Sequence, residues 1–270
     1  EFRRVLFRSH GTGHRGPKRH RRDHPSKPAQ GRNQPGTRKA RSRTQRARLG
    51  HWVPPSQSIL PAGIRTFKLR RGRMSSRQVQ ALEQPNPHLL TARNISTAWQ
   101  SEQPVILDIG FGSAPPVVEM ARSQPSTVVL AVDVHTPGVA SLVDQCARQD
   151  LTNVFVVEAD ALDVLPHLPA PLAGVRSFFP DPWPKVRHHK RRLVQPAVVQ
   201  AVYEAVQPSG FWHLATDWAE YATSLIDVFH SHHGWRGGTI ARPPWRPVTH
   251  FELRAIREGR PVVDVWMERI

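Results

Sequence analysis

The hydrophobic positions follow two alternating patterns from residue 105 onward. Continuous apolar runs, typical of strands buried on both faces, lie at 105–109, 127–132, 154–157, 174–179 and 211–215. Apolar residues recur at helical spacing between them, over 116–123, 138–149, 194–206 and 218–230. A last stretch, 261–267, alternates as a partly exposed strand does. This order predicts an α/β fold with a Rossmann-like, doubly wound, mostly parallel sheet.

The chain ahead of this pattern divides into three parts. Residues 1–9 match one reading frame of a common sequencing adapter, so we expect an assembly artefact there. Residues 10–63 are rich in Gly, Pro, Arg, Gln and Ser, and we expect a disordered basic tail. An arm at 64–74 mixes apolar anchors with cations, and Ser75 is a candidate cap for a short helix. We therefore expect one ordered domain over 64–270.

The charge is concentrated at the front of the chain. The formal net charge is +17, and residues 1–50 hold 16 Lys or Arg against 2 acidic residues. Such a segment attracts polyanions, most often nucleic acid, although it also suits a solubility tail or a tether to an anionic membrane. No apolar run approaches the ~20 residues that span a bilayer, and no signal-peptide core is present. The lone Cys146 fits a reducing cytosol, so we expect a cytoplasmic protein.

The segment FFPDPWPK at 178–185 carries the most information about chemistry. Its alternate prolines exclude a helix and hold Asp181 at the end of a buried strand, beside Trp183. The basic run HHKRR follows at 188–192. A carboxylate, an indole and a group of cations suit a nucleic-acid base with its phosphates. The alternative is a stiff loop with a packed Trp and solvated charges.

Acidic residues follow the predicted strands. Four strands end at Asp133, Asp160, Asp181 and Asp217, and Asp108 precedes the turn glycines Gly110 and Gly112. The carboxyl ends of parallel strands share one edge of a sheet, where ligands bind. An acid before the turn repels a pyrophosphate but suits a sulfonium ligand with an amino group, so S-adenosylmethionine fits better than NAD. Asp133 is placed for ribose hydroxyls and Asp160 for the adenine amine, although each acid alone also suits a helix cap.

These motifs resemble those of the bacterial tRNA (guanine-N7-)-methyltransferases, which are class I S-adenosylmethionine-dependent enzymes. The resemblance covers about residues 64–270 and rests on LDIGFG, VDVHTPGVASL, FFPDPWPKVRHHKRRLVQ, ATDW and RPVTHFELRAIREG. It implies formation of 7-methylguanosine at guanine 46 of the tRNA variable loop. It implies cofactor contacts from Asp108, Gly110, Gly112, Asp133, Asp160 and Asp181, with Asp181 also the catalytic residue. It implies substrate contacts from Lys185, Asp217, Thr249, His250, Phe251 and Glu252, and tRNA contacts from Arg187, His188, His189, Lys190, Arg191 and Arg192.

The chain departs from the family pattern at three places. After the glycine turn, where the family usually continues with a small residue and Gly, this chain has Ser113 and then Ala114, Pro115 and Pro116. Pro184 stands where the family often has His, and His250 replaces the usual Lys. These changes bear on the strength of binding, and they leave open a catalytically weak or inactive Rossmann-like RNA-binding protein. An NAD-dependent oxidoreductase is disfavoured because no third glycine or catalytic Tyr–Lys pair is well placed. Paired histidines without cysteine partners indicate no metal site, and the sequence does not decide the oligomeric state.

Overall fold

A computed structural model describes residue 55 and residues 59–61, 64–68, 72–98 and 103–270. The predicted adapter-derived start and most of the predicted tail lie outside these residues. Ile59 and Leu60 belong to that predicted tail, yet both pack against the hydrophobic core. Packed residues therefore precede the predicted boundary at 64, because these two apolar side chains bury themselves against the domain.

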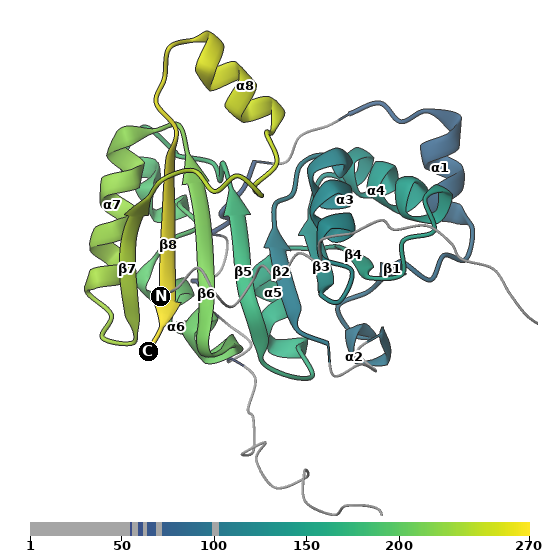
Figure 1. Cartoon of the computed structure of the whole chain (residues 1–270), viewed down its shortest axis with the longest axis horizontal. Helices are drawn as coiled ribbons and strands as arrows, with labels where there is room; N and C mark the ends of the chain where they lie inside the picture. Colours follow the sequence, from purple (N-terminus) through teal and green to yellow (C-terminus); the bar gives the residue numbers. More distant parts are fainter. Residues whose placement is uncertain (1–54, 56–58, 62–63, 69–71, 99–102) are drawn as a thin grey trace, which may run out of the picture. The chain divides into compact units, whose positions relative to one another are not determined.

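Across the described residues, eight strands form one sheet in the order β1-β4-β3-β2-β5-β6-β8-β7 (Figure 1). The strands are β1 Leu89–Leu90, β2 Val105–Ile109, β3 Val128–Asp133, β4 Val154–Glu158, β5 Leu172–Phe178, β6 Val206–Thr216, β7 Trp235–Ile240 and β8 Val263–Arg269. All neighbours from β1 to β6 pair in parallel, whereas β8 is antiparallel to both β6 and β7. This arrangement confirms the doubly wound, mostly parallel sheet predicted from the sequence.

Successive residues of the central strands enter two separate hydrophobic clusters. In β3, Val129 and Ala131 pack with helices α3 (Ala114–Ser123) and α4 (Thr136–Arg148). Val128 and Leu130 belong to the other cluster, with α5 (Ala161–Val164), α6 (Pro196–Ala205) and α7 (Ala219–His230). Because side chains alternate along a strand, a strand buried on both faces needs the continuous apolar run that the sequence shows.

The remaining helices flank this layered core. Helix α1 (Ser76–Glu83) contacts α4, and the Ser75 side chain accepts a hydrogen bond from the Gln78 N–H in a capping box, as predicted. Short helical segments are α2 (Ile95–Ala98), η2 (Leu165–His167) and η3 (Val186–Arg191). Helix α8 (His250–Arg257) lies before β8, over the end to which the parallel strands point (Figure 1).

Strand β7 and helix α8 are among the elements that the hydrophobic pattern does not predict, together with β1, α2 and α5. Strand β7 contains consecutive glycines and is mostly exposed, so it has little apolar periodicity. Helix α8 buries only Glu252 and Ala255, and exposes Leu253 and Ile256. Strand β6 also begins five residues earlier than predicted, because Val206 pairs with Leu172 before a register shift.

Candidate active site

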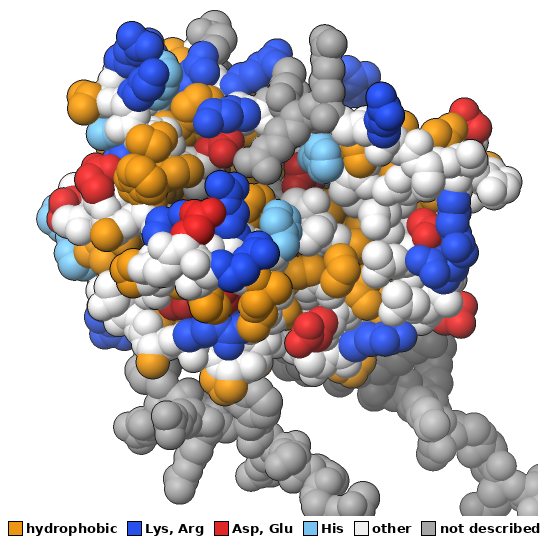
Figure 2. All heavy atoms as spheres, turned by 90° about the horizontal axis from the view of Figure 1, so that it is seen from above, with side chains coloured by type: hydrophobic (Ala, Val, Ile, Leu, Met, Phe, Trp, Pro, Cys, Tyr) orange, Lys and Arg blue, Asp and Glu red, His pale blue; other side chains and the backbone are white. Residues whose placement is uncertain are grey.

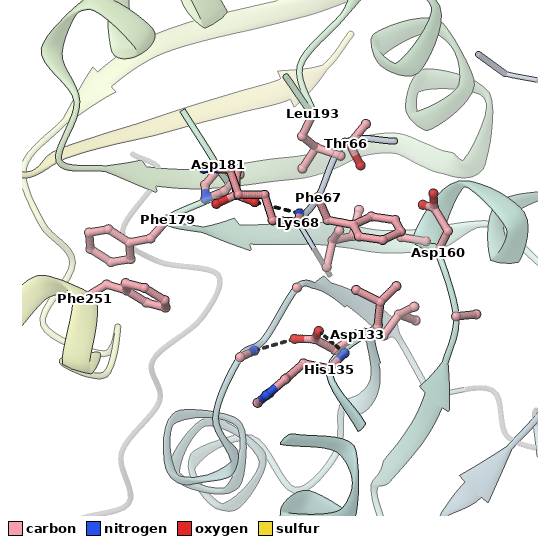
Figure 3. A pocket seen from close by; sticks show the side chains of 18 of the residues that line it. Thr66, Phe67, Lys68, Asp133, His135, Asp160, Phe179, Asp181, Leu193 and Phe251 are labelled. Atoms are coloured by element: carbon pink, nitrogen blue, oxygen red, sulfur yellow. Dashed lines mark hydrogen bonds between the residues drawn. The ribbon is translucent and has the colours of Figure 1, made fainter. Parts of the chain in front are cut away.

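One cavity of about 230 Å³ lies at the carboxyl ends of the central parallel strands (Figure 3). β2 pairs with β3 on one side and with β5 on the other, so the chain changes winding direction there. Such a switch point is where ligands bind in open α/β sheets. The predicted site residues that line this cavity are Gly110, Gly112, Asp133, Asp160, Asp181, His250 and Phe251.

Asp133 fixes the glycine turn on one side of the cavity. Its Oδ2 accepts a 2.7 Å hydrogen bond from the Gly112 N–H, and its Oδ1 accepts a 2.9 Å bond from the His135 N–H. Gly110 and Gly112 have φ values of +69° and +67°, a region that favours glycine. A Cβ added at Gly110 meets no atom within 4 Å, so a ligand can approach this backbone closely. The carboxylate thus holds a ligand-binding turn.

Asp160 has two roles in the structure. It is the N-cap of α5, where its side chain accepts a 3.0 Å hydrogen bond from the Leu162 N–H, and it also lines the cavity. Burial raises the pKa of its carboxyl, against the bond from Leu162. Phe67 and Ala161 line the same region, so the carboxylate lies beside apolar surface that suits a purine ring.

Asp181 meets the arm that precedes α1. The Lys68 N–H donates a 3.0 Å hydrogen bond to Asp181 Oδ2, and Thr66, Phe67 and Lys68 all line the cavity (Figure 3). Trp183, almost fully buried, donates from Nε1 to the Thr66 carbonyl over 3.3 Å. The structure therefore supports the interpretation of Trp183 as a side chain packed inside the protein.

Asp108 lies apart from the main cavity. It is 2% exposed and borders a smaller adjoining hollow together with Thr249, His250 and Phe251. Burial raises the pKa of Asp108 to about 7, while the charge of Arg176 lowers it and the charge of Asp133 raises it further. Arg176 lies opposite Asp108 in the register of the neighbouring strands β2 and β5.

The start of α8 divides the predicted substrate residues between two environments. His250 and Phe251 reach both cavities, whereas Thr249 borders only the smaller one and caps the helix by accepting from the Glu252 N–H. Glu252 is 3% exposed and lines neither cavity. Its oxygens accept 2.7 Å bonds from Arg242 and Arg246. The structure thus places its carboxylate in an internal ion network.

Two further predicted substrate residues lie away from the cavities. Asp217 follows β6 and pairs with Arg260 at 2.6 Å, and Lys185 is exposed at the N-cap of η3. Neither borders either of the two cavities described above. Their substrate contacts stay predictions.

The basic run after Lys185 is mostly exposed, with one exception. Arg187, Lys190 and Arg191 are exposed, and His188 and His189 are half-buried. Arg192 is 2% exposed, donates from Nε to the Pro182 carbonyl and forms a salt bridge with Glu220. The prediction that Arg192 contacts tRNA is therefore corrected, because its guanidinium is used inside the protein to hold the 180–185 loop.

Known proteins resemble this chain over most of its length. A family model described as "Putative methyltransferase" matches residues 102–265. The tRNA (guanine-N(7)-)-methyltransferase of Chromohalobacter salexigens is 38% identical over 232 residues, covering 81% of this chain and 94% of that relative. The enzyme of the same name from Nitrosospira multiformis is 41% identical over 212 residues, covering 75% and 93%. The chain belongs to the tRNA (guanine-N(7)-)-methyltransferase family.

Family membership confirms the relationship predicted from the motifs, and with it an S-adenosylmethionine-dependent methyltransferase. A solved 16S rRNA methyltransferase, KamB, has a TM-score of 0.50 and 16% identity, covering 64% of this chain and 91% of that protein. At that identity the likeness shows the fold alone.

The residues present in this tRNA (guanine-N(7)-)-methyltransferase family member fit S-adenosylmethionine. An open glycine turn held by Asp133, a carboxylate beside apolar surface at Asp160, and a third carboxylate at Asp181 surround one cavity. These groups suit the hydroxyls, the amine and the cationic centre of such a ligand. In the part of the chain that the structure describes, no cluster of three or more His, Cys, Asp or Glu is placed to bind a metal.

Sequence reasoning missed several cavity residues of this family member. Thr66, Phe67 and Lys68 come from the arm, and Phe179 was interpreted only as the end of a strand. The mixture of apolar and cationic residues in the arm was the available signal, but it does not indicate which surface the arm covers. Among the described residues, no helix is long and apolar enough to cross a bilayer.

Proposed function

We propose that this protein transfers a methyl group from S-adenosylmethionine to N7 of guanine 46 in the variable loop of tRNA. The observation that carries the proposal is the placement of Asp133, Asp160 and Asp181 on one cavity at the switch point of the sheet. Family membership supports the methyl transfer and the tRNA substrate, and the position within the tRNA is the finer part of the proposal.

The cofactor would lie along the cavity beside the carboxylates of Asp133 and Asp160. Asp160 and the apolar surface of Phe67 and Ala161 would hold the adenine, and Asp133 would face the ribose. Gly110 and Gly112 would let the methionine portion approach the backbone. Bound S-adenosylmethionine supplies an electrophilic methyl group on a sulfonium sulfur.

The guanine needs orientation more than deprotonation. Its N7 carries an in-plane lone pair and no proton, so no general base is required for attack on the methyl carbon. The protein would align N7, methyl carbon and sulfur within attacking distance. Asp181 would accept hydrogen bonds from guanine N–H groups and stabilise the positive charge that develops on the purine.

The exposed cations would hold the tRNA phosphates. Figure 2 views the molecule from the side to which the parallel strands point, and Lys and Arg side chains lie over this face. Four exposed cations lie in or directly after the 180–185 loop, namely Lys185, Arg187, Lys190 and Arg191. We expect them, together with the basic residues 10–63, to supply the salt-dependent part of tRNA binding. We also propose a cytoplasmic location, where tRNA is found and the free thiol of Cys146 stays reduced.

Two matched tRNA transcripts test the proposal. One carries guanine at position 46 and the other adenine, and both are incubated with the full chain and S-adenosylmethionine. Reduction and chain cleavage at 7-methylguanosine then map the product. We expect cleavage at position 46 of the first transcript alone. Methylation at another nucleotide contradicts the assignment of position 46. A protein that binds tRNA but neither methylates it nor binds S-adenosylhomocysteine would instead be a non-catalytic RNA-binding protein.

A further inference from the structure

Two phenyl rings from distant parts of the chain face each other across the cavity end next to Asp181. The centroids of Phe179 and Phe251 are 6.0 Å apart, with an angle of 23° between the ring planes (Figure 3). Phe179 follows β5 and Phe251 lies in the first turn of α8, and both line the cavity. We name these two side chains the aromatic pair.

The backbone holds the aromatic pair in place at a cost. Phe179 has φ of +56°, a conformation that non-glycine residues seldom adopt, and its N–H donates a 2.7 Å hydrogen bond to the Ala215 carbonyl. Such strain persists where surrounding structure imposes it, and it is concentrated at functional sites. Phe251 in turn lies 3.9 Å, between ring centroids, from His250. Phe179 is therefore held by a contact with a distant segment, whereas Phe251 packs against its neighbour in the first turn of α8.

The chemistry of the reaction gives this geometry a use. Methylation at N7 converts a neutral purine into a cation, so positive charge grows on the ring as the reaction proceeds. The faces of aromatic rings attract cations within about 6 Å of the ring centroid, and more strongly where water is excluded. Asp181 lines the same cavity and offers a carboxylate to the edge of the base, which leaves the faces of the base for neighbouring rings.

We propose that the aromatic pair stacks on the guanine and favours its methylated, cationic form over the neutral one. The inference rests on the proposed function and deepens it: Phe179 and Phe251 position the substrate and stabilise charge developing on its ring. The site therefore binds 7-methylguanine more tightly than guanine, and product departure is slowed by the same contact that speeds methyl transfer.

Nucleotide binding and catalysis test the inference separately. The probes are guanosine 5′-monophosphate and 7-methylguanosine 5′-monophosphate, titrated by calorimetry into the full protein saturated with S-adenosylhomocysteine. We expect the methylated nucleotide to bind at least fivefold more tightly to the parent protein. Phe179→Leu and Phe251→Leu should each bring that ratio near one and lower kcat for tRNA about tenfold. Phe251→Tyr, which keeps an aromatic face, should retain both properties.

A stacked ring outside the cavity provides the control. Phe211 stacks on Trp266 with centroids 4.2 Å apart, and neither residue lines the cavity. Phe211→Leu should leave the nucleotide ratio and kcat unchanged, while circular dichroism and Tm verify that each variant folds. Folded Phe179→Leu and Phe251→Leu proteins with the parent ratio and the parent kcat would overturn the inference. Absence of tRNA methylation by the parent protein is a different result, which refutes the proposed function itself.

Discussion

The backbone N–H of Lys68 donates a 3.0 Å hydrogen bond to Oδ2 of Asp181, so the arm before α1 is attached to the loop after β5. The same arm receives a hydrogen bond from Trp183 at the Thr66 carbonyl. Two residues of a proline-rich loop thus hold a segment more than a hundred positions earlier in the chain, and that segment covers part of the cavity. The arm that lines part of the cavity is therefore bonded directly to the loop that holds Asp181.

We predict that Asp181→Asn keeps the fold and lowers the rate of methyl transfer at least a hundredfold. The amide oxygen of Asn still accepts the bond from Lys68, but the negative charge that stabilises the cationic purine is lost. A single-turnover assay with saturating cofactor measures the chemical step. Asp227→Asn, an exposed substitution on α7, is the matched control and should behave as the parent. A near-normal single-turnover rate for Asp181→Asn would remove its catalytic role.

We predict that Asp133→Asn weakens S-adenosylhomocysteine binding about tenfold or more. The carboxylate accepts from the Gly112 and His135 N–H groups at once, and an Asn side chain has only one acceptor oxygen for both. Either the Gly112 N–H or the His135 N–H then loses its bond to this side chain, and the charge offered to the ribose is lost as well. Isothermal titration calorimetry gives the dissociation constant. Unchanged affinity would show that the turn holds its shape without Asp133.

We predict a pH dependence of stability from Asp108. Burial raises its pKa from 3.8 to about 7, with Arg176 opposing that rise and Asp133 adding to it. The folded protein binds this proton more tightly than the unfolded chain, so the contribution of the group to stability falls as pH rises between those two values. Asp108→Asn lacks the titration. Its free energy of unfolding, relative to the parent, should rise by about 3 kcal/mol from pH 5 to pH 8.

Urea unfolding at several pH values measures that difference. Groups distant from Asp108 titrate equally in the parent and the variant, and therefore cancel from the comparison. A flat difference for Asp108→Asn would show that its carboxyl titrates near the ordinary value.

We predict opposite consequences for two adjacent arginines. Arg191 is exposed, with its guanidinium 4.9 Å from the Trp183 ring centroid, so Arg191→Ala should raise KM for tRNA and reduce the salt slope by about one. Arg192 is buried and bonded to Pro182 and Glu220, so Arg192→Ala should lower Tm and leave the salt slope unchanged. Measurements of KM at several salt concentrations and of Tm separate the two. Equal effects of both substitutions on the salt slope would restore Arg192 as a tRNA contact.

We predict that Arg246→Met lowers the free energy of unfolding by about 3–5 kcal/mol, because it removes a charged partner from two buried carboxylates, which then keep only Arg242 and His213. Arg246 lies 2.7 Å from both Glu252 and Asp264. Arg254→Met is the matched control on α8, where the pair with Glu258 is exposed and contributes below 1 kcal/mol. Urea denaturation measures both. Similar losses for the two variants would mean that the buried network adds little to stability.

Several elements of the fold were predictable because their signals are local. The β3 run and the Ser75 cap each depend on residues within a few positions, and both lie where the sequence predicts them. Strand β7 and helix α8 were not predictable, because they bury few apolar residues and are held by partners elsewhere in the chain. The position of Asp133 and Asp160 at one edge of the sheet could be predicted from the topology, because the carboxyl ends of parallel strands share that edge.

Burial patterns and short motifs are properties of neighbouring residues, so the layered α/β fold, the family and the acidic residues at the strand ends could be predicted from the order of residues alone. The inward direction of Arg192 and Glu252, the separate hollow beside Asp108 and the contact of Phe179 with Phe251 depend instead on how distant segments pack. A side chain is directed inward or outward by the packing and charge of segments distant in the chain. The direction of such a side chain therefore cannot be predicted from the residues next to it in the sequence.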